Sequence, residues 1–211
     1  MAVKTMNGAA SRERILDAAR GEFAEKGFEK ASLRVIAQKA DLTTGAIYGY
    51  FSTKQDLFNA IVAPAANELL SLFESAQRKF YEQPFERQGM EDMLGFTLEV
   101  NKRIVSVLYD NRDAFLLVLE KAGGTPWADY VERFVEIEAE STTRYVDVRN
   151  EGGDDKISAI SDTLARTLAR SYFACLFEVF RLEPAEADAF ANMQALVRFY
   201  HRGYEALFED A

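Results

Sequence analysis

The stretch Leu33–Phe51, LRVIAQKADLTTGAIYGYF, decides the fold of this chain. Apolar residues repeat at helical spacing on both sides of Asp41-Leu42-Thr43, where the pattern is interrupted. The spacing predicts one short helix over Leu33–Ala40 and a second over Thr44–Tyr50, with Thr43 as the N-cap of the second. Two short helices joined by such a turn form a helix-turn-helix.

A longer helix before this pair supplies the surface on which it docks. Ile15, Leu16, Ala19 and Phe23 repeat at three- and four-residue intervals, which predicts a helix over Arg12–Lys26. Ser11 is the expected N-cap of this helix, and Ser32 that of Leu33–Ala40. Gly27 is the expected stop signal of the first helix. The three helices together predict an N-terminal domain over residues 1–52.

A fourth helix follows directly. Ser52 and Gln55 have the spacing of a capping box, which predicts that the helix opens near Thr53 and runs to about Glu82. Pro64 lies inside this helix and removes one of its hydrogen bonds, so we expect a kink at residues 60–64.

The rest of the chain is also helical in pattern, and no alternating strand pattern occurs. Breaks of Gly, Pro and Asp predict five further helices: Met90–Tyr109, Arg112–Lys121, Pro126–Arg149, Asp155–Arg181 and Pro184–Phe208. The fold class is therefore all-α, with an N-terminal helix-turn-helix domain and a helical domain over residues 53–211.

Composition excludes several classes of protein. The 211 residues include one Cys and one His, which rules out a disulfide framework and leaves no nucleophile–base pair or metal cluster. No Gly-rich phosphate loop occurs, so we expect no enzyme activity, no catalytic residue, no metal and no cofactor. No apolar run is long enough to span a membrane, and residues 1–10 lack the apolar core of a secretory signal. We expect a cytoplasmic protein without membrane contact.

Charge is distributed unevenly along the chain. The net charge is −9, yet residues 1–62 carry nine Lys or Arg and seven Asp or Glu, a net +2. The remaining residues carry a net −11. A mildly basic N-terminal part followed by a strongly acidic remainder is compatible with a C-terminal part that faces away from DNA.

Spacing alone does not separate DNA binding from ordinary helix packing. The residues themselves resemble a family, through Arg14–Ala19, Phe23, Gly27-Phe28, Ser32–Ala37 and above all Gly45–Lys54, GAIYGYFSTK. This stretch of about residues 11–62 resembles the TetR (tetracycline repressor) family of bacterial transcription regulators. Beyond residue 62 only the length and the helical layout are similar.

The resemblance implies a DNA-reading surface centred on the second short helix. Arg34 is placed to contact bases or phosphate, the tyrosines to contact phosphate, sugar or thymine methyls, and Lys54 to hold a phosphate. Either tyrosine can instead serve packing. The DNA-binding residues expected are Arg34, Thr43, Thr44, Gly45, Ala46, Tyr48, Gly49, Tyr50 and Lys54.

Two residues depart from the family pattern. Asp41 stands at a turn position where Gly is usual, and Asp tolerates left-handed geometry best after Gly and Asn. Gly49 stands inside the expected recognition helix and offers no side chain for base contact.

The resemblance also implies a homodimer that acts on a palindromic double-stranded DNA operator and responds to a small-molecule effector of unknown identity, with repression as the family default. The apolar stretch Tyr172–Phe180, together with Leu196, Phe199, Tyr200, Tyr204 and Leu207, suits a four-helix dimer interface. The same residues can instead form the core of the monomer.

An effector cavity is expected in the second domain. Glu138 and Asn101 lie in the middle of apolar helix faces, and aromatic residues with a few inward polar groups are typical of ligand pockets. The expected lining is Phe96, Asn101, Phe115, Trp127, Tyr130, Phe134, Glu138 and Tyr145. An ionised Glu138 favours a cationic or hydrogen-bond-donating ligand. Alternatively, Glu138 pairs with an internal Arg, or lies at the surface.

Two other functions remain open at this point. One is a family member whose input is a protein partner rather than a small ligand, which a tightly packed C-terminal core would favour. The other is a helical ligand-binding module with weakened DNA binding. Gly49 favours this alternative because it offers no side chain for base contact.

Overall fold

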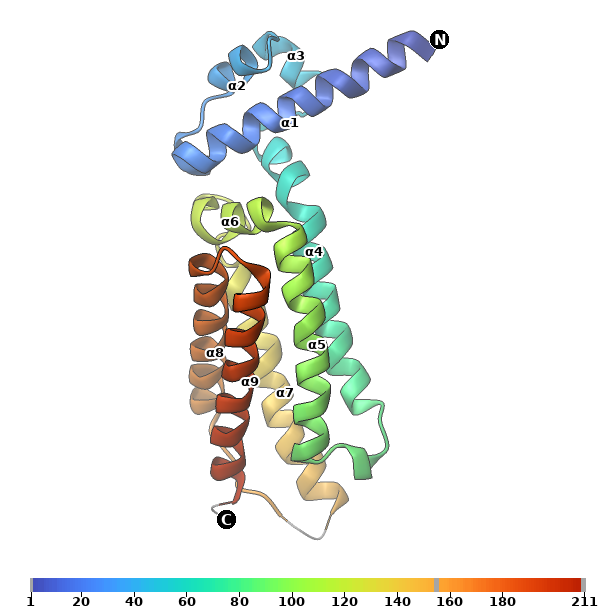
Figure 1. Cartoon of the computed structure of the whole chain (residues 1–211), viewed down its shortest axis with the longest axis vertical. Coiled ribbons are helices and arrows are strands. Elements are labelled where there is room, and N and C mark those ends of the chain that lie inside the picture. The colour runs from blue at the N-terminus through green and yellow to red at the C-terminus, as the bar shows by residue number, and fades with distance from the viewer. Residues whose placement is uncertain (1, 154–155, 210–211) are drawn as a thin grey trace. The chain divides into compact units, whose positions relative to one another are not determined.

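A computed structural model describes residues 2–153 and 156–209. Within these ranges the chain contains α-helices and one short 3-10 helix and no strand, which confirms the all-α prediction (Figure 1). The chain divides into two compact units. The first unit comprises Met1–Asn67 and Asn111–Tyr130, and the second Glu68–Asp110 and Val131–Ala211. The functional boundary between residues 52 and 53 stays a prediction.

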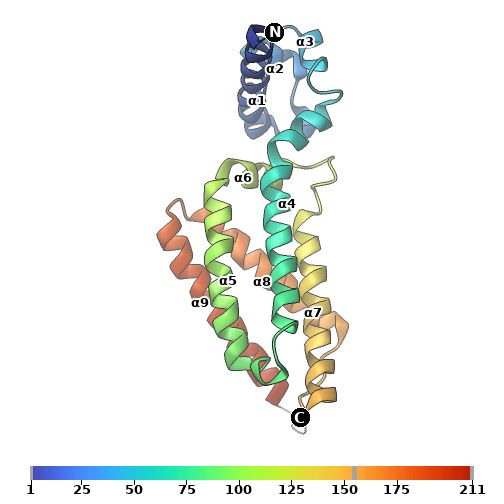
Figure 2. The ribbon, with the colours of Figure 1, turned by 90° about the vertical axis from the view of Figure 1, so that its right-hand side faces the viewer.

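The first unit holds the helix-turn-helix. It contains α1 (Ala2–Lys30), α2 (Leu33–Lys39), α3 (Thr44–Tyr48), the first part of α4 (Lys54–Tyr81) and α6 (Arg112–Lys121) (Figure 2). α1 packs against α2 and α6, and α2 against α3. Seven of the apolar residues that carry the helix pattern are buried here: Ile15, Leu16, Phe23, Ile36, Ala37, Ile47 and Phe51. Phe28 is half-buried and stacks on Phe23 with a centroid distance of 6.1 Å.

α1 begins earlier than its sequence pattern predicts. The helix starts at Ala2, so Ser11 lies within it and is not its N-cap. No proline precedes Arg12 to stop the helix from extending backwards. The stop predicted at Gly27 is confirmed as a break, because Gly27 has φ 72° and ψ 163° and only one further turn follows to Lys30.

A buried carboxylate ties α2 to α1. Glu22 is 3% exposed; its Oε1 accepts a hydrogen bond from the backbone N–H of Ser32 at 3.3 Å. Its Oε2 accepts one from Nζ of Lys39 at 3.0 Å. Ser32 is the N-cap of α2 as predicted by position, but its side chain makes no capping hydrogen bond. The buried charge of Glu22 is thus paired, as a carboxylate at such a site requires.

α4 spans both units. Its N-cap is Thr53, whose Oγ1 accepts from the N–H of Asp56 at 3.0 Å, so the prediction of a box built on Ser52 is wrong by one residue. The helix remains continuous through Pro64. The kink at residues 60–64 stays a prediction.

The second unit is a bundle of helices (Figures 1 and 2). It contains the rest of α4, the 3-10 helix η1 (Phe85–Arg87), α5 (Met90–Asp110), nearly all of α7 (Tyr130–Gly152), α8 (Asp162–Leu182) and α9 (Glu186–Glu209). α9 packs against α5 and α8. Its core is rich in aromatic contacts, including Phe134 with Phe173 at 5.5 Å between ring centroids.

Two helices of this part begin later than predicted. Residues Pro126–Asp129 form turns, so α7 starts at Tyr130 and runs on to Gly152. Residues 156–161 are irregular, because Asn150 pairs with both backbone groups of Ile157, and α8 starts only after its N-cap Ser161. Asp155, the predicted start of that helix, lies outside the described residues.

Candidate functional site

The turn between α2 and α3 sets the position of the expected DNA-reading helix. Asp41 adopts φ 54°, the left-handed geometry that its place in the turn requires and that Asp tolerates. Thr43 is the N-cap of α3 as predicted, since its Oγ1 accepts from the N–H of Ala46 at 3.1 Å. Its hydroxyl hydrogen can still donate to a phosphate.

α3 presents aromatic side chains to solvent. Tyr48 is 55% exposed and Tyr50 is 40% exposed, which is unusual for large rings. Arg34, Thr43, Gly45 and Gly49 are also exposed, whereas Thr44 and Ala46 are half-buried. Gly49 is the C-cap of α3 and does not lie in its middle, because the helix ends at Tyr48. The prediction that Gly49 lies inside this helix is wrong. The predicted helix was too long because the apolar pattern continues to Phe51.

Lys54 has structural contacts in this unit. Its Nζ donates to the backbone oxygens of Glu29 and Ala31, at 3.1 and 3.2 Å, and lies 4.6 Å from the ring centroid of Phe28. It therefore caps the C-terminal carbonyls of α1 with two of its three donors. Phosphate binding by Lys54 stays a prediction.

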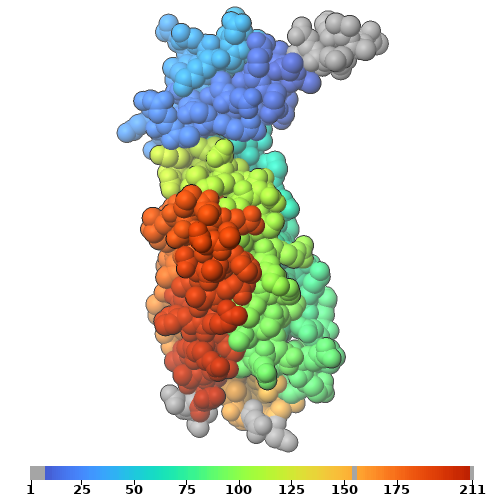
Figure 3. All heavy atoms as spheres, viewed as in Figure 1, coloured from blue at the N-terminus to red at the C-terminus, as the bar shows by residue number. Residues whose placement is uncertain are grey.

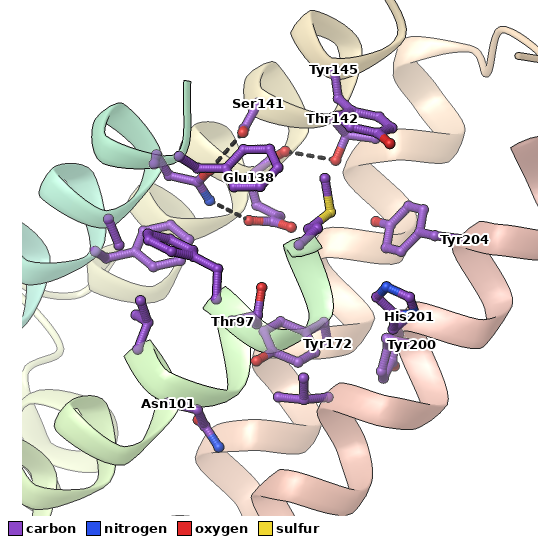
Figure 4. Close-up of a pocket in the computed structure, with 18 of the residues that line it drawn as sticks. Thr97, Asn101, Glu138, Ser141, Thr142, Tyr145, Tyr172, Tyr200, His201 and Tyr204 are labelled. Atoms are coloured by element: carbon purple, nitrogen blue, oxygen red, sulfur yellow. Dashed lines mark hydrogen bonds between the residues drawn. The ribbon is translucent and has the colours of Figure 1, made fainter. Parts of the chain in front are cut away.

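The second unit contains a partly open cavity of about 140 Å³ lined by residues of α4, α5, α7, α8 and α9 (Figure 4). Four of the eight predicted lining residues border it: Phe96, Asn101, Glu138 and Tyr145. Figure 4 shows Glu138 facing a space bounded by Thr97 of α5, Tyr172 of α8 and Tyr204 of α9.

The other four predicted residues do not border this cavity. Phe115, Trp127 and Tyr130 belong to the first unit, where the Trp127 indole donates to Oδ1 of Asn59 at 2.8 Å and the Tyr130 hydroxyl to the oxygen of Ala66 at 2.8 Å. Phe134 packs against Phe73, Phe173 and Phe177 in the core of the second unit. The prediction fails for Trp127 because it precedes the start of α7, so the helical periodicity does not extend to it.

Glu138 is the carboxylate of the cavity lining. Its Oε2 accepts from Nε2 of Gln77 at 2.8 Å, and Oε1 of Gln77 accepts from the Ser141 hydroxyl at 2.6 Å. The Tyr81 hydroxyl donates to the backbone oxygen of Ser141 at 2.6 Å. Burial raises the pKa of Glu138 to about 7, opposed in part by the hydrogen bond from Gln77.

The phenols around Glu138 remain neutral. Burial raises the pKa of Tyr81 to about 12. Burial and the nearby charge of Glu138 raise the pKa of Tyr172 and of Tyr204 well above the ordinary value. These hydroxyls therefore carry their protons at any physiological pH.

Two further polar side chains of the lining have hydrogen-bonding groups without a partner among the described residues. Asn101 is 1% exposed, and neither its amide oxygen nor its amide nitrogen has a hydrogen-bond partner among the described residues. In Figure 4 its amide turns away from Glu138. His201 donates from Nε2 to the backbone oxygen of Met90 at 2.6 Å, and its Nδ1 lies 3.7 Å from Oε1 of Glu205.

The sequence pattern did not identify the contribution of α8 and α9 to this cavity. Tyr172, Tyr200 and Tyr204 line it, although their periodicity had suggested a dimer face. Phe173, Leu176, Phe177 and Phe180 of the same stretch are buried within the unit and form its core. The four-residue spacing of Tyr200, Tyr204 and Phe208 in the sequence shows that they share one face of a helix. It does not show which other part of the chain that face packs against.

α8 and α9 also present an apolar outer surface. Leu164, Leu182 and Phe199 are exposed, Phe199 to 71%, which is the largest value among the exposed large apolar residues. Ala195, Gly203 and Ala206 are exposed beside Phe199 on α9. Figure 3 shows α9, in red, uncovered along one face of the second unit.

Comparison with known proteins identifies the helix-turn-helix. The family model of the bacterial regulatory proteins of the tetR family matches residues 15–61. Residues 15–61 are therefore similar to the DNA-binding part of this family. The matched stretch contains the exposed α3, the Thr43 cap and the turn at Asp41.

Curated relatives match part of the chain. The uncharacterized HTH-type transcriptional regulator YdgC of Bacillus subtilis is 34% identical over 98 residues, 46% of this chain and 44% of the relative. The HTH-type transcriptional regulator AcrR of Shigella flexneri is 40% identical over 81 residues, 38% of each chain. The matches thus span less than half the length of these relatives. Both relatives are named as transcriptional regulators.

Solved structures share the fold over nearly the whole chain. NalD of Pseudomonas aeruginosa, named as the secondary repressor of the MexAB-OprM multidrug efflux pump, has a TM-score of 0.58 at 20% identity and covers 97% of this chain and 100% of its own. A TetR-like regulator of a Rhodococcus species has a TM-score of 0.60 at 16% identity, covering 92% of this chain and 96% of its own. In the part of the chain that the structure describes, no helix has the length and apolarity to cross a lipid bilayer.

Proposed function

We propose that this protein is a ligand-responsive repressor of the TetR family that binds a palindromic operator as a homodimer in the cytoplasm. The observation that carries the proposal is the exposure of Tyr48 and Tyr50 on and beside a helix whose start is held by the Thr43 cap. A recognition helix must present its side chains to the major groove rather than to the core. Arg34, Thr43, Thr44, Gly45, Ala46, Gly49 and Lys54 complete the proposed DNA-contacting set.

A dimer is supported by the exposed apolar surface of α8 and α9. Large apolar side chains such as Leu182 and Phe199 cost free energy in water, and a second copy of the same surface would cover them. Two recognition helices about 34 Å apart would then meet successive major grooves on one side of the DNA.

The ligand response is assigned to the cavity of the second unit. A ligand there changes DNA binding only if its affinity differs between the DNA-bound and the released conformations. α4 contributes to both units, so we propose that it transmits the change, with Pro64 as its flexible point. Pro64→Ala with unchanged DNA affinity and unchanged ligand response would reject that role.

The test is selection of genomic DNA fragments by the purified full chain, followed by sequencing of the retained fragments. An inverted repeat among them supports a dimeric, sequence-specific regulator and points to neighbouring genes. Arg34→Ala and Tyr48→Ala should lose at least tenfold in operator affinity, whereas Lys102→Ala, an exposed site in the second unit, should not. Retention of nothing above background contradicts the DNA-binding part of the proposal.

A further inference from the structure

The charge of the cavity lining has one sign. Among its residues Glu138 is the one carboxylate, and no Lys or Arg takes part. An anionic ligand would therefore meet a carboxylate with no fixed cation beside it, so the lining disfavours anions.

Glu138 is half-buried, and a fully buried carboxylate of the same chain, Glu22, provides the comparison. Glu22 has an ion pair with Lys39 and a hydrogen bond from the Ser32 backbone. Glu138 accepts its hydrogen bond from the neutral amide of Gln77, and no ion pair of the described residues includes it. A carboxylate can accept about four hydrogen bonds, so Glu138 has capacity for a donor inside the cavity.

The walls around Glu138 are aromatic. Rings come from every helix that borders the cavity: Phe73, Phe80 and Tyr81 of α4, Phe96 of α5, Tyr145 of α7, Tyr172 of α8, and Tyr200, Tyr204 and Phe208 of α9. Ring faces carry negative charge density and attract cations. The phenol hydroxyls are neutral and do not oppose this attraction.

We propose that the cavity binds an organic cation with a compact apolar body, whose charge pairs with Glu138 while the aromatic walls enclose the rest. This inference rests on the proposed ligand response of the second unit and names the chemical class of its ligand. The 140 Å³ cavity suits a body of about one aromatic ring, since an engineered apolar cavity of about 150 Å³ in another protein holds benzene.

The inference has a pH signature. Without ligand Glu138 is about half ionised near pH 7, and a bound cation favours the ionised form. Affinity for a permanent cation should therefore rise by about tenfold from pH 6 to pH 8. The cavity lining contains titratable side chains besides Glu138 from four helices: Tyr81 of α4, Tyr145 of α7, Tyr172 of α8, and Tyr200, His201 and Tyr204 of α9. The α5 residues of the lining include no titratable side chain.

Calorimetric titration of the full chain with three small probes tests the class. Phenyltrimethylammonium is the permanent cation, 2-phenyl-2-propanol the neutral compound of similar shape, and benzoate the anion. The cation should bind at least tenfold more tightly than either of the others at pH 8. Glu138→Gln should lose at least tenfold in cation affinity, keep the affinity for the neutral probe within twofold, and lose the part of the pH dependence due to Glu138.

Two variants serve as controls. Glu140→Gln removes a carboxylate from an exposed position of the same helix and should bind the cation like the unchanged chain. Glu138→Asp keeps the charge and should retain part of the cation affinity. This control distinguishes loss of the charge from misfolding as the cause of weaker binding in Glu138→Gln.

Equal affinity for the neutral and the cationic probe, unchanged cation affinity in Glu138→Gln, or binding of none of the three at millimolar concentration would overturn the inference. Operator retention by the same preparation is measured separately. A chain that retains its operator but fails the probe titration leaves the DNA-binding function standing and removes only the cation class.

Discussion

At the scale of single residues, Glu138 is a carboxylate without an ion pair among the described residues of the second unit. The carboxylate lies among aromatic rings of the cavity lining and accepts a hydrogen bond from Gln77. Its pKa of about 7 means that folding costs free energy whenever the carboxylate is ionised. A site that weakens the fold in this way is typical of function rather than of stability.

The pH dependence of stability tests this state of Glu138. The pKa rises from 4.5 to about 7 on folding, so the folded chain holds a proton that the unfolded chain releases. The free energy of unfolding should therefore fall as pH rises from about 4.5 to 7, by at most about 3 kcal/mol, and then level off. Urea unfolding of the unchanged chain against Glu138→Gln measures this loss as a difference between two curves. A difference that does not vary with pH would contradict the raised pKa.

Lys54 has two possible roles, which a second pair of measurements separates. Lys54→Ala removes the cap on the carbonyls of Glu29 and Ala31, and should lower the free energy of unfolding by about 1–2 kcal/mol. If Lys54 also holds a phosphate, the slope of log affinity against log salt should fall by about one. Lys102→Ala, whose partner is the neighbouring Glu99, should change neither quantity. Unchanged stability in Lys54→Ala would contradict the capping role.

At the scale of elements, the end of α1 depends on one glycine. Gly27 has φ 72° and ψ 163°, a conformation open almost only to glycine, and it lets the chain leave the helix toward α2. Gly21 lies in the same helix with helical geometry, and a Cβ there would meet nothing within 4 Å.

These two glycines form a matched pair. Gly27→Ala should lower the free energy of unfolding by about 1–3 kcal/mol, because alanine is strained at this backbone geometry. Gly21→Ala should raise it by about 0.5–1 kcal/mol, because alanine favours the helix without a clash. Thermal and urea unfolding of both variants checks the pair. A stabilised Gly27→Ala would show that the break in α1 is not required.

At the scale of the whole molecule, the apolar surface of α8 and α9 is the feature that a single chain leaves unexplained. Within the described residues, Phe199 and Leu182 contribute their rings and methyl groups to solvent rather than to the core. A regulator that reads a palindrome needs a two-fold axis, and this surface is the proposed site for it.

Phe199→Glu tests the proposed dimer. A carboxylate at the centre of a covered apolar surface should raise the dimer dissociation constant at least tenfold, as measured by sedimentation at several concentrations. Ser106→Glu, which adds the same charge at an exposed site on α5, is the control. A chain whose mass in solution is unaffected by Phe199→Glu would place the dimer surface elsewhere. A monomeric unchanged chain would contradict the dimer itself.

Local sequence determined the helices, the turn at Asp41, the Thr43 cap and the apolar faces that hold Glu138 and Asn101. These features depend on interactions within a few residues, which spacing and residue type encode directly. Only the tertiary structure decided that Trp127 and Tyr130 pack in the first unit and that Tyr172 and Tyr204 line the same cavity as Glu138. It also decided that no Lys or Arg of the described residues forms an ion pair with Glu138. Helical periodicity tells which residues share a face, but the partner of that face comes from distant parts of the chain.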